Sequence, residues 1–270
     1  GQLMRADATA QLLKASGLPV EPVVPCEDTY GCQRALREGR IDLMVEYTGT
    51  GLVYLGEPLP SREQTLPRLA ELYAPDGLEW IAPLGFDNSY VVAIRTDRAA
   101  AMGIRTISDL SRFAGGLAVA CPGEFLRRPL DGLRALLARY GLSRRLEPLV
   151  DDAPGPRVSA LLEGMADIAV VYATDGVLLD SRLTVLVDDL QFFPPYEGVF
   201  LARSDALRRH AELRPGLMRL QGLFDDSGMR GLNRLVQEGQ RTPEAAAPEF
   251  LDGRQPLEPT VTGGRPARLL

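Results

Sequence analysis

The chain has 270 residues, of which 45% are hydrophobic and 24% are charged, and its formal net charge at pH 7 is −6. This length fits one large or two modest domains, and an acidic chain without clustered lysine and arginine argues against a nucleic-acid-binding protein. No run of eighteen apolar residues occurs, so the sequence contains no candidate membrane-spanning helix. The three cysteines and the single histidine, His210, predict neither a metal site nor a Ser-His triad, and we expect no cofactor.

Helical periodicity of apolar residues alternates along the chain with short apolar runs. The periodicity predicts helices at residues 3–15, 30–38, 61–73, 109–114, 129–140, 157–163, 206–213 and 229–238. The apolar runs predict strands at residues 20–24, 43–47, 90–95, 117–120, 168–172, 183–186 and 199–202. Because helices and strands alternate, we expect an α/β architecture with largely parallel strands.

Two unbroken apolar segments, residues 90–95 and 183–189, lie near one third and two thirds of the chain length. If the chain crosses between lobes at these segments, lobe 1 comprises residues 1–92 and 189–270, and lobe 2 comprises residues 93–188. Two crossings form a hinge, which is typical of a binding protein whose lobes close on a ligand. Residues 253–270, rich in proline and glycine, are expected to form an irregular tail.

One pattern, Glu-Gly-x-x-Asp-x-x-x-x-Tyr-x-x-x-Gly, occurs at residues 38–51 and again at residues 163–176. Glycine after a helical run suits a helix C-terminus, and the apolar residues that follow predict a buried strand. Each strand ends in a tyrosine, Tyr47 or Tyr172. Because ligands of open α/β sheets bind beyond the carboxyl ends of strands, the repeat predicts two similar lobes that offer aromatic side chains to one shared site. Coincidence between two helix–strand joints is the alternative.

Aromatic residues also end or follow other predicted strands. They occur in the motifs Glu-Tyr-Thr-Gly-Thr at residues 46–50, Gly-Phe-Asp-Asn-Ser-Tyr at 85–90, Glu-Phe-Leu-Arg-Arg-Pro at 124–129, Tyr-Ala-Thr-Asp-Gly at 172–176 and Phe-Phe-Pro-Pro-Tyr-Glu at 192–197. In this combination the chain resembles, over residues 1–252, the substrate-binding proteins of ABC importers for quaternary ammonium compounds such as glycine betaine, carnitine and choline.

The resemblance implies a two-lobed periplasmic-binding-protein fold of type II, no enzymatic activity and a location outside the cytoplasm, at the membrane through an anchor or a permease. It also implies a permease partner and a monomeric state. In that family four tyrosines surround the trimethylammonium group and an arginine helps to hold the carboxylate. The implied ligand-binding residues here are Tyr47, Tyr90, Tyr172 and Tyr196 for the box, Arg128 for the carboxylate, and Thr50 and Phe125 nearby.

The chemistry of the ligand agrees with these residue types. A quaternary ammonium group has no N–H and spreads its charge over methyl groups, so it is attracted to aromatic faces, each contributing about 0.5–2 kcal/mol. A guanidinium can donate two parallel hydrogen bonds to a carboxylate. The alternative for Tyr47, Tyr90 and Tyr172 is core packing, and the alternative for Arg128 is a surface salt bridge.

Family members usually begin with a strand and a lysine-containing turn that precede the first helix, and neither occurs here. We hypothesise that the C-terminal tail, through Val261 or residues 267–270, fills the gap in lobe 1. The numbering could instead begin after processing, or the chain could be a segment of a longer protein. Cys26 and Cys32 are close enough in sequence to form a disulfide, although the sequence cannot show the required geometry.

Three other functions remain open. The same fold could bind ergothioneine or another trimethylammonium betaine. It could also be a ligand-sensing domain of a receptor or regulator, although no DNA-binding element occurs in the chain. A transferase with Cys121 as a covalent anchor is the third, although no general base accompanies this cysteine.

Overall fold

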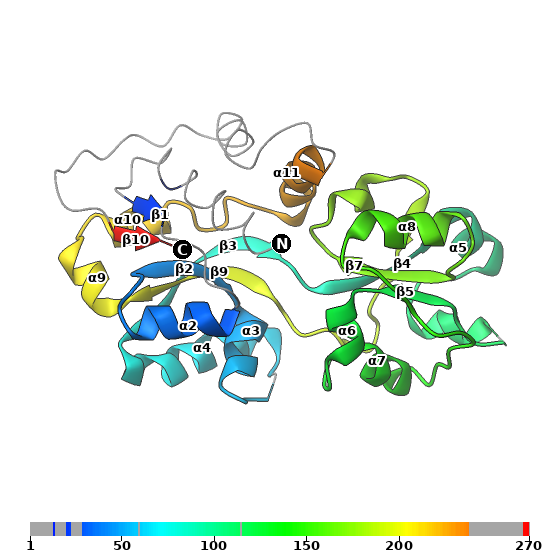
Figure 1. Ribbon diagram of the computed structural model, residues 1–270, viewed down its shortest axis with the longest axis horizontal. Coiled ribbons are helices and arrows are strands. Elements are labelled where there is room, and N and C mark those ends of the chain that lie inside the picture. The colour runs from blue at the N-terminus through cyan, green and yellow to red at the C-terminus, as the bar shows by residue number, and fades with distance from the viewer. Residues whose placement is uncertain are drawn as a thin grey trace. The chain divides into compact units, whose positions relative to one another are not determined.

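The chain passes twice between two structural units (Figure 1). The structure, a computed structural model, describes residues 13, 20–22, 29–58, 60–113, 115–237 and 267–269. Unit 1 comprises Gly1–Asp87 and Pro195–Leu270, and unit 2 comprises Asn88–Pro194. The chain thus crosses between Asp87 and Asn88 and returns between Pro194 and Pro195, whereas the sequence placed the lobe boundaries after residues 92 and 188.

Unit 1 is a five-stranded sheet with helices. Its strands are β1 (Val20–Pro22), β2 (Leu43–Tyr47), β3 (Leu78–Asp87), β9 (Glu197–Arg203) and β10 (Ala267–Leu269), in the order β1-β10-β2-β9-β3. Its helices are α2 (Thr29–Arg37), α3 (Thr48–Tyr54), α4 (Arg62–Tyr73), the 3-10 helix η1 (Ala74–Asp76), α9 (Ser204–Arg209), α10 (Leu213–Met218) and α11 (Asp226–Gln237). Of the predicted helix at residues 3–15, only Leu13 is described, and it is helical and buried.

Alternation along β2 separates two cores in unit 1. Leu43 packs with residues of α9 and α10, whereas Met44 packs with residues of α2, α3 and α4. Successive side chains of a strand point to opposite faces, so the two helix groups cover opposite faces of the sheet. Tyr47, which follows Leu43 by four residues, packs on the same face as Leu43.

The predicted gap in this sheet is filled by β10. It pairs in parallel with β1, Val20 opposite Ala267, and with β2, Leu269 opposite Leu43. Among the described strands β1 has β10 as its one neighbour. The hypothesis that the tail supplies a strand is confirmed for Ala267–Leu269. Val261 and Cys26 lie outside the described residues, so the role of Val261 and the Cys26–Cys32 disulfide stay predictions.

Unit 2 repeats the plan with another five-stranded sheet. Its strands are β4 (Tyr90–Arg95), β5 (Val119–Cys121), β6 (Leu149–Val150), β7 (Ile168–Tyr172) and β8 (Leu183–Val185), in the order β6-β5-β7-β4-β8. Its helices are α5 (Thr96–Met102), α6 (Gly123–Arg127), α7 (Leu133–Arg139), α8 (Pro154–Leu162) and the 3-10 helices η2 (Ser108–Arg112) and η3 (Gly176–Leu179).

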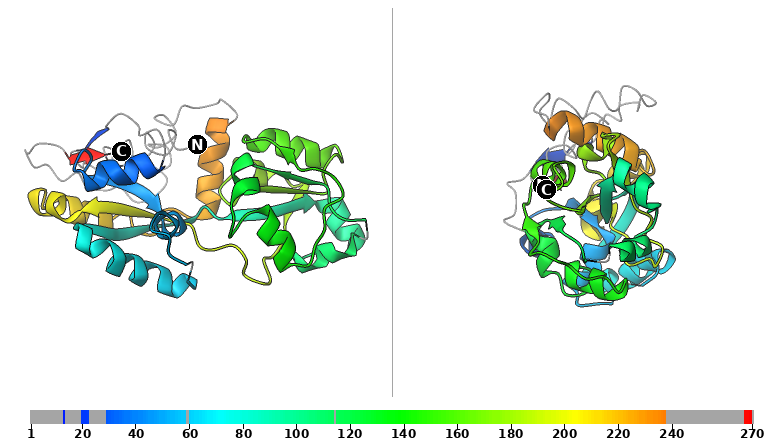
Figure 2. Two further views of the ribbon diagram at one scale, coloured as in Figure 1. Left: turned by 60° about the horizontal axis from the view of Figure 1, so that its bottom comes forward. Right: turned by 90° about the vertical axis from the view of Figure 1, so that its right-hand side faces the viewer.

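The two faces of this sheet are again covered by different helices (Figure 1, Figure 2). Ile168 and Val170 of β7 pack with residues of α6 and α7, whereas Ala169 and Val171 pack with residues of α8. Tyr172 packs on the same face as Ile168. The strand therefore turns its terminal tyrosine toward α6, which contains Phe125.

Four of the five described strands in each sheet run in the same direction, so the expectation of largely parallel strands is confirmed. The exceptions are β9 and β4. β9 runs antiparallel to β2 and β3, and β4 runs antiparallel to β7 and β8. These two strands each follow directly on a crossing between the units, with no crossover helix to return the chain in the parallel sense. The helix predicted at residues 206–213 is confirmed in part, because α9 ends at Arg209 and a separate helix, α10, begins at Leu213.

The ten-residue strand β3 was not predicted. Pro83 and Gly85 interrupt its apolar pattern, and both are atypical of strand interiors. The register with β9 shifts on either side of Pro83, and Gly85 has a φ of 104°. A Cβ atom at Gly85 would lie 2.3 Å from the carbonyl oxygen of Phe224, so only glycine allows this approach of the segment that precedes α11.

Tyr73 gives unit 1 a specific pH dependence. Its side chain is fully buried, its hydroxyl donates a hydrogen bond to the carbonyl oxygen of Gly51 at 2.9 Å, and burial raises its pKa to about 12 despite the opposing effect of Arg37. An unfolded tyrosine titrates near 10. The folded state therefore holds this proton more tightly, and the stabilisation present below pH 10 is lost as the pH rises from about 10 to 12, by about 2–3 kcal/mol at most.

We expect Tyr73→Phe to lower the free energy of unfolding by about 1 kcal/mol at pH 8, because the hydrogen bond to Gly51 is lost. The difference should shrink and reverse by pH 12, since phenylalanine has no proton to lose. Urea unfolding of both proteins between pH 8 and 12 measures this, and parallel stability curves would contradict the assignment.

Candidate functional site

The repeated sequence pattern is also repeated in structure. Gly39 and Gly164 both follow a helix and both have positive φ, 72° and 78°. Such a backbone conformation is accessible to glycine at little cost and ends a helix. The strands that follow, β2 and β7, end at Tyr47 and Tyr172, as predicted. The two units thus present a tyrosine at equivalent strand ends.

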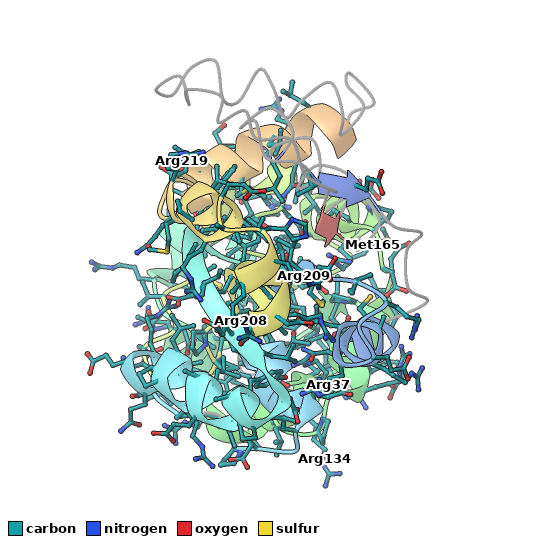
Figure 3. All side chains as sticks on the ribbon, turned by 90° about the vertical axis from the view of Figure 1, so that its left-hand side faces the viewer. Arg37, Arg134, Met165, Arg208, Arg209 and Arg219 are labelled. Carbon is teal, nitrogen blue, oxygen red and sulfur yellow. The ribbon has the colours of Figure 1, made fainter. Side chains whose placement is uncertain are left out.

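The aspartate of the pattern anchors the start of each strand. Asp42 and Asp167 are buried, and each forms an ion pair with at least one arginine. Asp42 contacts Arg209 of α9 at 3.2 Å, and Arg209 is labelled in Figure 3. Asp167 contacts both Arg98, at 2.8 Å, and Arg145, at 2.9 Å. In both copies of the repeat, the spacing therefore places a structural aspartate at the start of the strand and a tyrosine at its end.

In unit 2, Tyr90 and Tyr172 form a cross-strand pair. They lie directly opposite each other in the antiparallel register of β4 and β7, which places their side chains on the same face. The rings stack with centroids 4.8 Å apart and an interplanar angle of 26°, and the two hydroxyl oxygens are 3.3 Å apart. Their rings therefore form one double layer.

Two phenylalanines complete this cluster. Phe125 of α6 lies 4.8 Å from the Tyr90 ring, and Phe193 lies 6.3 Å from Tyr90 and 6.1 Å from Phe125. Tyr90 is 4% exposed, whereas Tyr172 is half-buried. We define the unit 2 aromatic cluster as Tyr90, Phe125, Tyr172 and Phe193. Burial, with smaller contributions from Tyr172 and Glu124, raises the pKa of Tyr90 far above its ordinary value, so its phenol is neutral.

Phe193 was not assigned to the site from the sequence, although its motif was noticed. Its position depends on Asp188, whose carboxylate accepts hydrogen bonds from the backbone N–H groups of Phe192 and Phe193, both at 2.9 Å. The hydroxyl of Tyr140 also donates to Asp188. Neither Asp188 nor Tyr140 was assigned to the site from the sequence, so this loop anchor was missed.

Arg128 has carboxylate partners within the protein. Its Nε and Nη2 atoms donate to the two oxygens of Asp131 at 2.7 and 2.6 Å, and Nη1 donates to Glu124 at 2.9 Å. Its guanidinium carbon lies 5.8 Å from the centroid of the Tyr90 ring. Arg128 thus lies beside the aromatic cluster, and a ligand carboxylate would have to compete with Asp131 and Glu124 for it.

In unit 1, the predicted residues lie around the junction of β2 and α3. Tyr47 ends β2 and contacts Phe86 edge-to-face at 6.4 Å, and Thr50 is half-buried in the first turn of α3. Tyr196 is 7% exposed, and its ring lies against Gly49, where a Cβ atom would be 2.7 Å from a ring carbon. The glycine of the Glu-Tyr-Thr-Gly-Thr motif is therefore required for the ring of Tyr196 to lie where it does.

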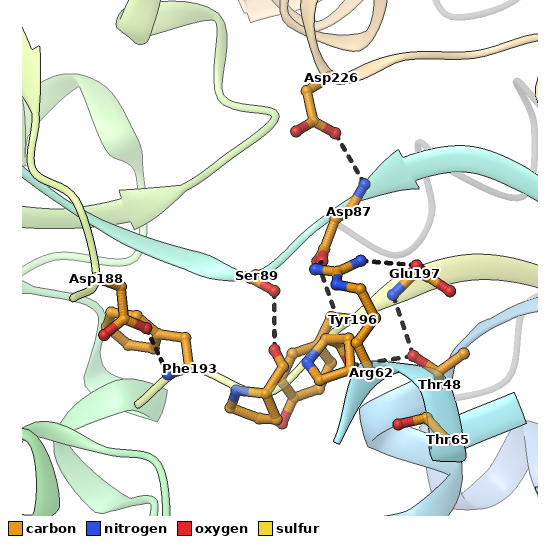
Figure 4. Close-up of polar contacts among 12 residues, drawn as sticks. Thr48, Arg62, Thr65, Asp87, Ser89, Asp188, Phe193, Tyr196, Glu197 and Asp226 are labelled. Carbon is orange, nitrogen blue, oxygen red and sulfur yellow. Dashed lines mark hydrogen bonds and ion pairs between the residues drawn. The ribbon is translucent and has the colours of Figure 1, made fainter. Parts of the chain in front are cut away.

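The backbone of the Tyr196 loop is fixed by side chains from three other segments, as Figure 4 shows. Thr48 Oγ1 donates to the carbonyl oxygen of Pro195 at 3.0 Å and accepts from the N–H of Glu197 at 3.1 Å. The N–H of Tyr196 donates to Asp87 at 3.0 Å. Arg62 forms ion pairs with Asp87 and Glu197. These contacts tie together the two segments of unit 1 that lead to the crossings.

Next to these contacts lies a pocket of about 620 Å³ within unit 1, lined in part by Arg62, Asp87, Glu197, Asp226 and Arg230. Asp226 of α11 accepts a hydrogen bond from the N–H of Asp87 at 2.8 Å. None of the residues predicted to bind a ligand lines this pocket. In this pocket Arg62 is paired with Asp87 and Glu197, and we assign the pocket no ligand.

Cys121 is unsuited to covalent chemistry. It is fully buried, and burial raises the pKa of its thiol to about 11, despite the opposing effects of Arg157 and Arg144. The thiolate is the nucleophilic form of cysteine, and it is scarce at neutral pH with such a pKa. This weighs against the transferase alternative. In the part of the chain that the structure describes, no group of three or more metal-ligating side chains comes together.

No helix among the described residues has the length and apolar character needed to cross a membrane.

Comparison with protein families and known proteins gives concordant matches. Residues 1–253 match the family described as the substrate-binding domain of ABC-type glycine betaine transport systems. The glycine-betaine-binding protein of Pseudomonas aeruginosa is 32% identical over 255 residues, which cover 90% of this chain and 81% of that protein. The carnitine transport binding protein OpuCC of Listeria monocytogenes is 30% identical over 244 residues, covering 87% of this chain and 77% of that protein.

A third relative differs in its ligand and in its length. The ergothioneine transport permease/ergothioneine binding protein EgtU of Helicobacter pylori is 28% identical over 226 residues, which cover 83% of this chain but 40% of that protein. Among solved structures, a glycine betaine/carnitine/choline ABC transporter protein superimposes with a TM-score of 0.79 at 24% identity, over 94% of this chain and 97% of that one. This likeness confirms the expected two-lobed periplasmic-binding-protein fold of type II.

Proposed function

Because the chain belongs to the family of substrate-binding domains of ABC-type glycine betaine transport systems, we propose that it binds a quaternary ammonium compound of the glycine betaine type and delivers it to a membrane permease. Substrate-binding proteins of ABC importers are extracytoplasmic, bind small ligands and work with permease subunits. The proposal adds that this chain is a monomer without catalytic or nucleic-acid-binding activity, held at the membrane by an anchor or by its permease.

The observation that supports this ligand class is the unit 2 aromatic cluster. Tyr172 and Phe193 are its half-buried members, and the ring of Tyr90 stacks against that of Tyr172 at 4.8 Å. A stacked partner fixes the orientation of the Tyr172 ring, and a methylated cation gains about 0.5–2 kcal/mol against each aromatic face. We propose that Tyr172 contacts the trimethylammonium group, with Tyr90 and Phe125 as the layer that supports it.

The residues of unit 1 have the same proposed role on the basis of their motifs. Tyr47, Thr50 and Tyr196 are proposed to contact the quaternary ammonium compound, and the contacts of Gly49 and Thr48 keep the Tyr196 segment in a defined conformation. For Arg128 we propose a contact with a ligand carboxylate. That role requires the carboxylate to replace Asp131 or Glu124 as a partner, so Arg128→Ala should weaken glycine betaine binding more than choline binding.

We expect Tyr172→Ala and Tyr196→Ala each to weaken glycine betaine binding by roughly tenfold or more, because each removes an aromatic face from the cation. Isothermal titration calorimetry measures the affinity. Tyr54→Ala is the matched control, since Tyr54 lies outside the aromatic motifs, under the guanidinium of Arg37 at 4.8 Å. Unchanged affinity in both site variants, with normal folding, would refute the assignment of the box.

A second candidate ligand is ergothioneine, which is also a trimethylammonium betaine. The named function of the Helicobacter pylori relative favours including it. Titration of the unmodified protein with glycine betaine, choline, carnitine and ergothioneine distinguishes the candidates. A protein that binds none of the four would contradict the proposed ligand class.

A further inference from the structure

A buried charge, that of Arg157, lies close to the strand end that carries Tyr172. The side chain of Arg157, in the first half of α8, is 0% exposed. Arginine stays protonated in proteins, so this is a fully buried positive charge. Burial lowers the pKa of Arg157, and the nearby charge of Asp175 opposes this effect. Removing such a charge from water costs free energy, so the groups that contact Arg157 indicate its role.

The partners of Arg157 lead to Tyr172. Nη1 donates a hydrogen bond to the carbonyl oxygen of Asp151 at 2.7 Å, and Nη2 lies 3.7 Å from Oδ2 of Asp175. The same Oδ2 atom accepts the backbone N–H of Tyr172 at 2.9 Å, and the N–H of Asp175 donates to the carbonyl oxygen of Tyr172 at 2.9 Å. A chain of contacts thus runs from Arg157 through Asp175 to the backbone of Tyr172.

The ion pair between Arg157 and Asp175 does not have the geometry expected of a pair that serves stability alone. Its Nε and Nη2 atoms are buried and make no hydrogen bond within the described residues, and the 3.7 Å separation from Asp175 is longer than a direct hydrogen bond. A buried ion pair often contributes little to stability when compared with apolar residues of similar size. What the pair does provide is a fixed carboxylate at the point where β7 ends.

We propose that Arg157 is a positioning residue for ligand binding, which holds the carboxylate of Asp175 so that Asp175 fixes the backbone of Tyr172. This inference rests on the proposed function, because it assumes that Tyr172 contacts the ligand. Neither Arg157 nor Asp175 contacts the ligand in this scheme. The positive charge of Arg157 attracts and orients the carboxylate, and the carboxylate holds the strand end on which the Tyr172 ring depends.

The test separates positioning from ligand binding by measuring both. In Arg157→Met we expect the amide hydrogen of Tyr172 to exchange roughly tenfold faster than in the unmodified protein, relative to the amide of Val170 on the same strand, and glycine betaine affinity to fall by about tenfold. Arg157→Lys, which retains the charge, should give intermediate values for both. Amide exchange is measured by NMR, and affinity by calorimetry.

The matched control is Arg145→Met at the opposite end of β7. It removes an ion pair with the buried Asp167, so it should lower thermal stability while leaving the Tyr172 amide and the glycine betaine affinity unchanged. If Arg157→Met does not fold, the double variant Arg157→Met/Asp175→Asn decides, because it removes both charges and keeps a side-chain oxygen that can accept the Tyr172 N–H. We expect it to fold, with fast exchange at Tyr172 and weakened binding.

The outcomes are distinguishable. Unchanged relative exchange at Tyr172 in folded variants lacking Arg157 would overturn the positioning role. An equal loss of affinity in Arg145→Met would also overturn it, since a general loss of stability would then explain the result. If Tyr172 exchange increases but affinity does not change, and Tyr172→Ala also binds normally, Arg157 positions the strand end and the proposed function of Tyr172 fails instead.

Discussion

Replacing Arg268 with proline is expected to disrupt unit 1 and to cause the largest loss of stability among the substitutions considered. Arg268 is the middle residue of β10, which has a strand on each side, and it pairs with Glu21 of β1. Proline has no N–H to donate and is excluded from central strands. A buried carbonyl left without a donor costs about 1–3 kcal/mol, and a folded domain is stable by only about 5–15 kcal/mol.

Arg268→Thr is the matched control, because threonine keeps the N–H and suits a strand. We expect urea unfolding to show a much lower midpoint for Arg268→Pro and a nearly unchanged one for Arg268→Thr. Deletion of residues 267–270 should act like the proline variant, since β1 loses its described neighbour. If the deleted and unmodified proteins unfold at the same denaturant concentration, β10 does not belong to the core of unit 1.

The second large effect is expected from Gly132→Ala in unit 2. A Cβ atom at Gly132 would lie 2.3 Å from the carbonyl oxygen of Arg128 and 2.4 Å from that of Phe125. Ordinary contacts are about 3.5–4.0 Å, so the backbone on one side must move by roughly 1 Å. Crowding of this kind costs about 1–3 kcal/mol, and both displaced residues belong to the candidate site. We therefore expect loss of stability together with glycine betaine binding weakened by roughly tenfold or more.

Gly155→Ala controls for the change from glycine to alanine, since nothing lies within 4 Å of a Cβ atom at Gly155 in α8. That variant should be neutral or slightly more stable, because alanine favours helix by up to about 1 kcal/mol. Thermal unfolding and calorimetry of both variants test the expectation. A Gly132→Ala protein with unchanged stability would mean that the segment from Phe125 to Arg128 adapts without strain.

The features that were predictable from the sequence are those set by local pattern. Strands β2, β4 and β7 were predicted with the observed bounds, because each is a buried apolar run next to a helix end or turn. Strand β3 was missed because Pro83 and Gly85 break its pattern, and its pairing depends on β9, more than a hundred residues later. The two antiparallel strands, β4 and β9, were not singled out from the sequence either, because each takes its direction from a crossing between the units.

In the candidate site, too, features set by local sequence were predictable and features set by long-range contacts were not. Strand-end tyrosines were predictable because β2 and β7 each expose their terminal residue at an equivalent position. The contacts that hold these aromatic residues in place were not predictable. Asp188 holds Phe193, and Asp87 and Thr48 hold the Tyr196 segment, and no local spacing in the sequence predicts these contacts. For Arg128 the plain alternative, a salt bridge, is what the structure contains, and its ligand-binding role remains a proposal.

The position of β10 has a consequence for the order in which the two units form during synthesis. Unit 2 is one continuous stretch, Asn88–Pro194, so it can reach its final structure as soon as that stretch has left the ribosome. The sheet of unit 1 needs β9 and then Ala267–Leu269, so β1 and β2 have open edges until Ala267–Leu269 has been translated. Unpaired strand edges invite association with other chains, so the nascent first segment is the part that most needs chaperone protection.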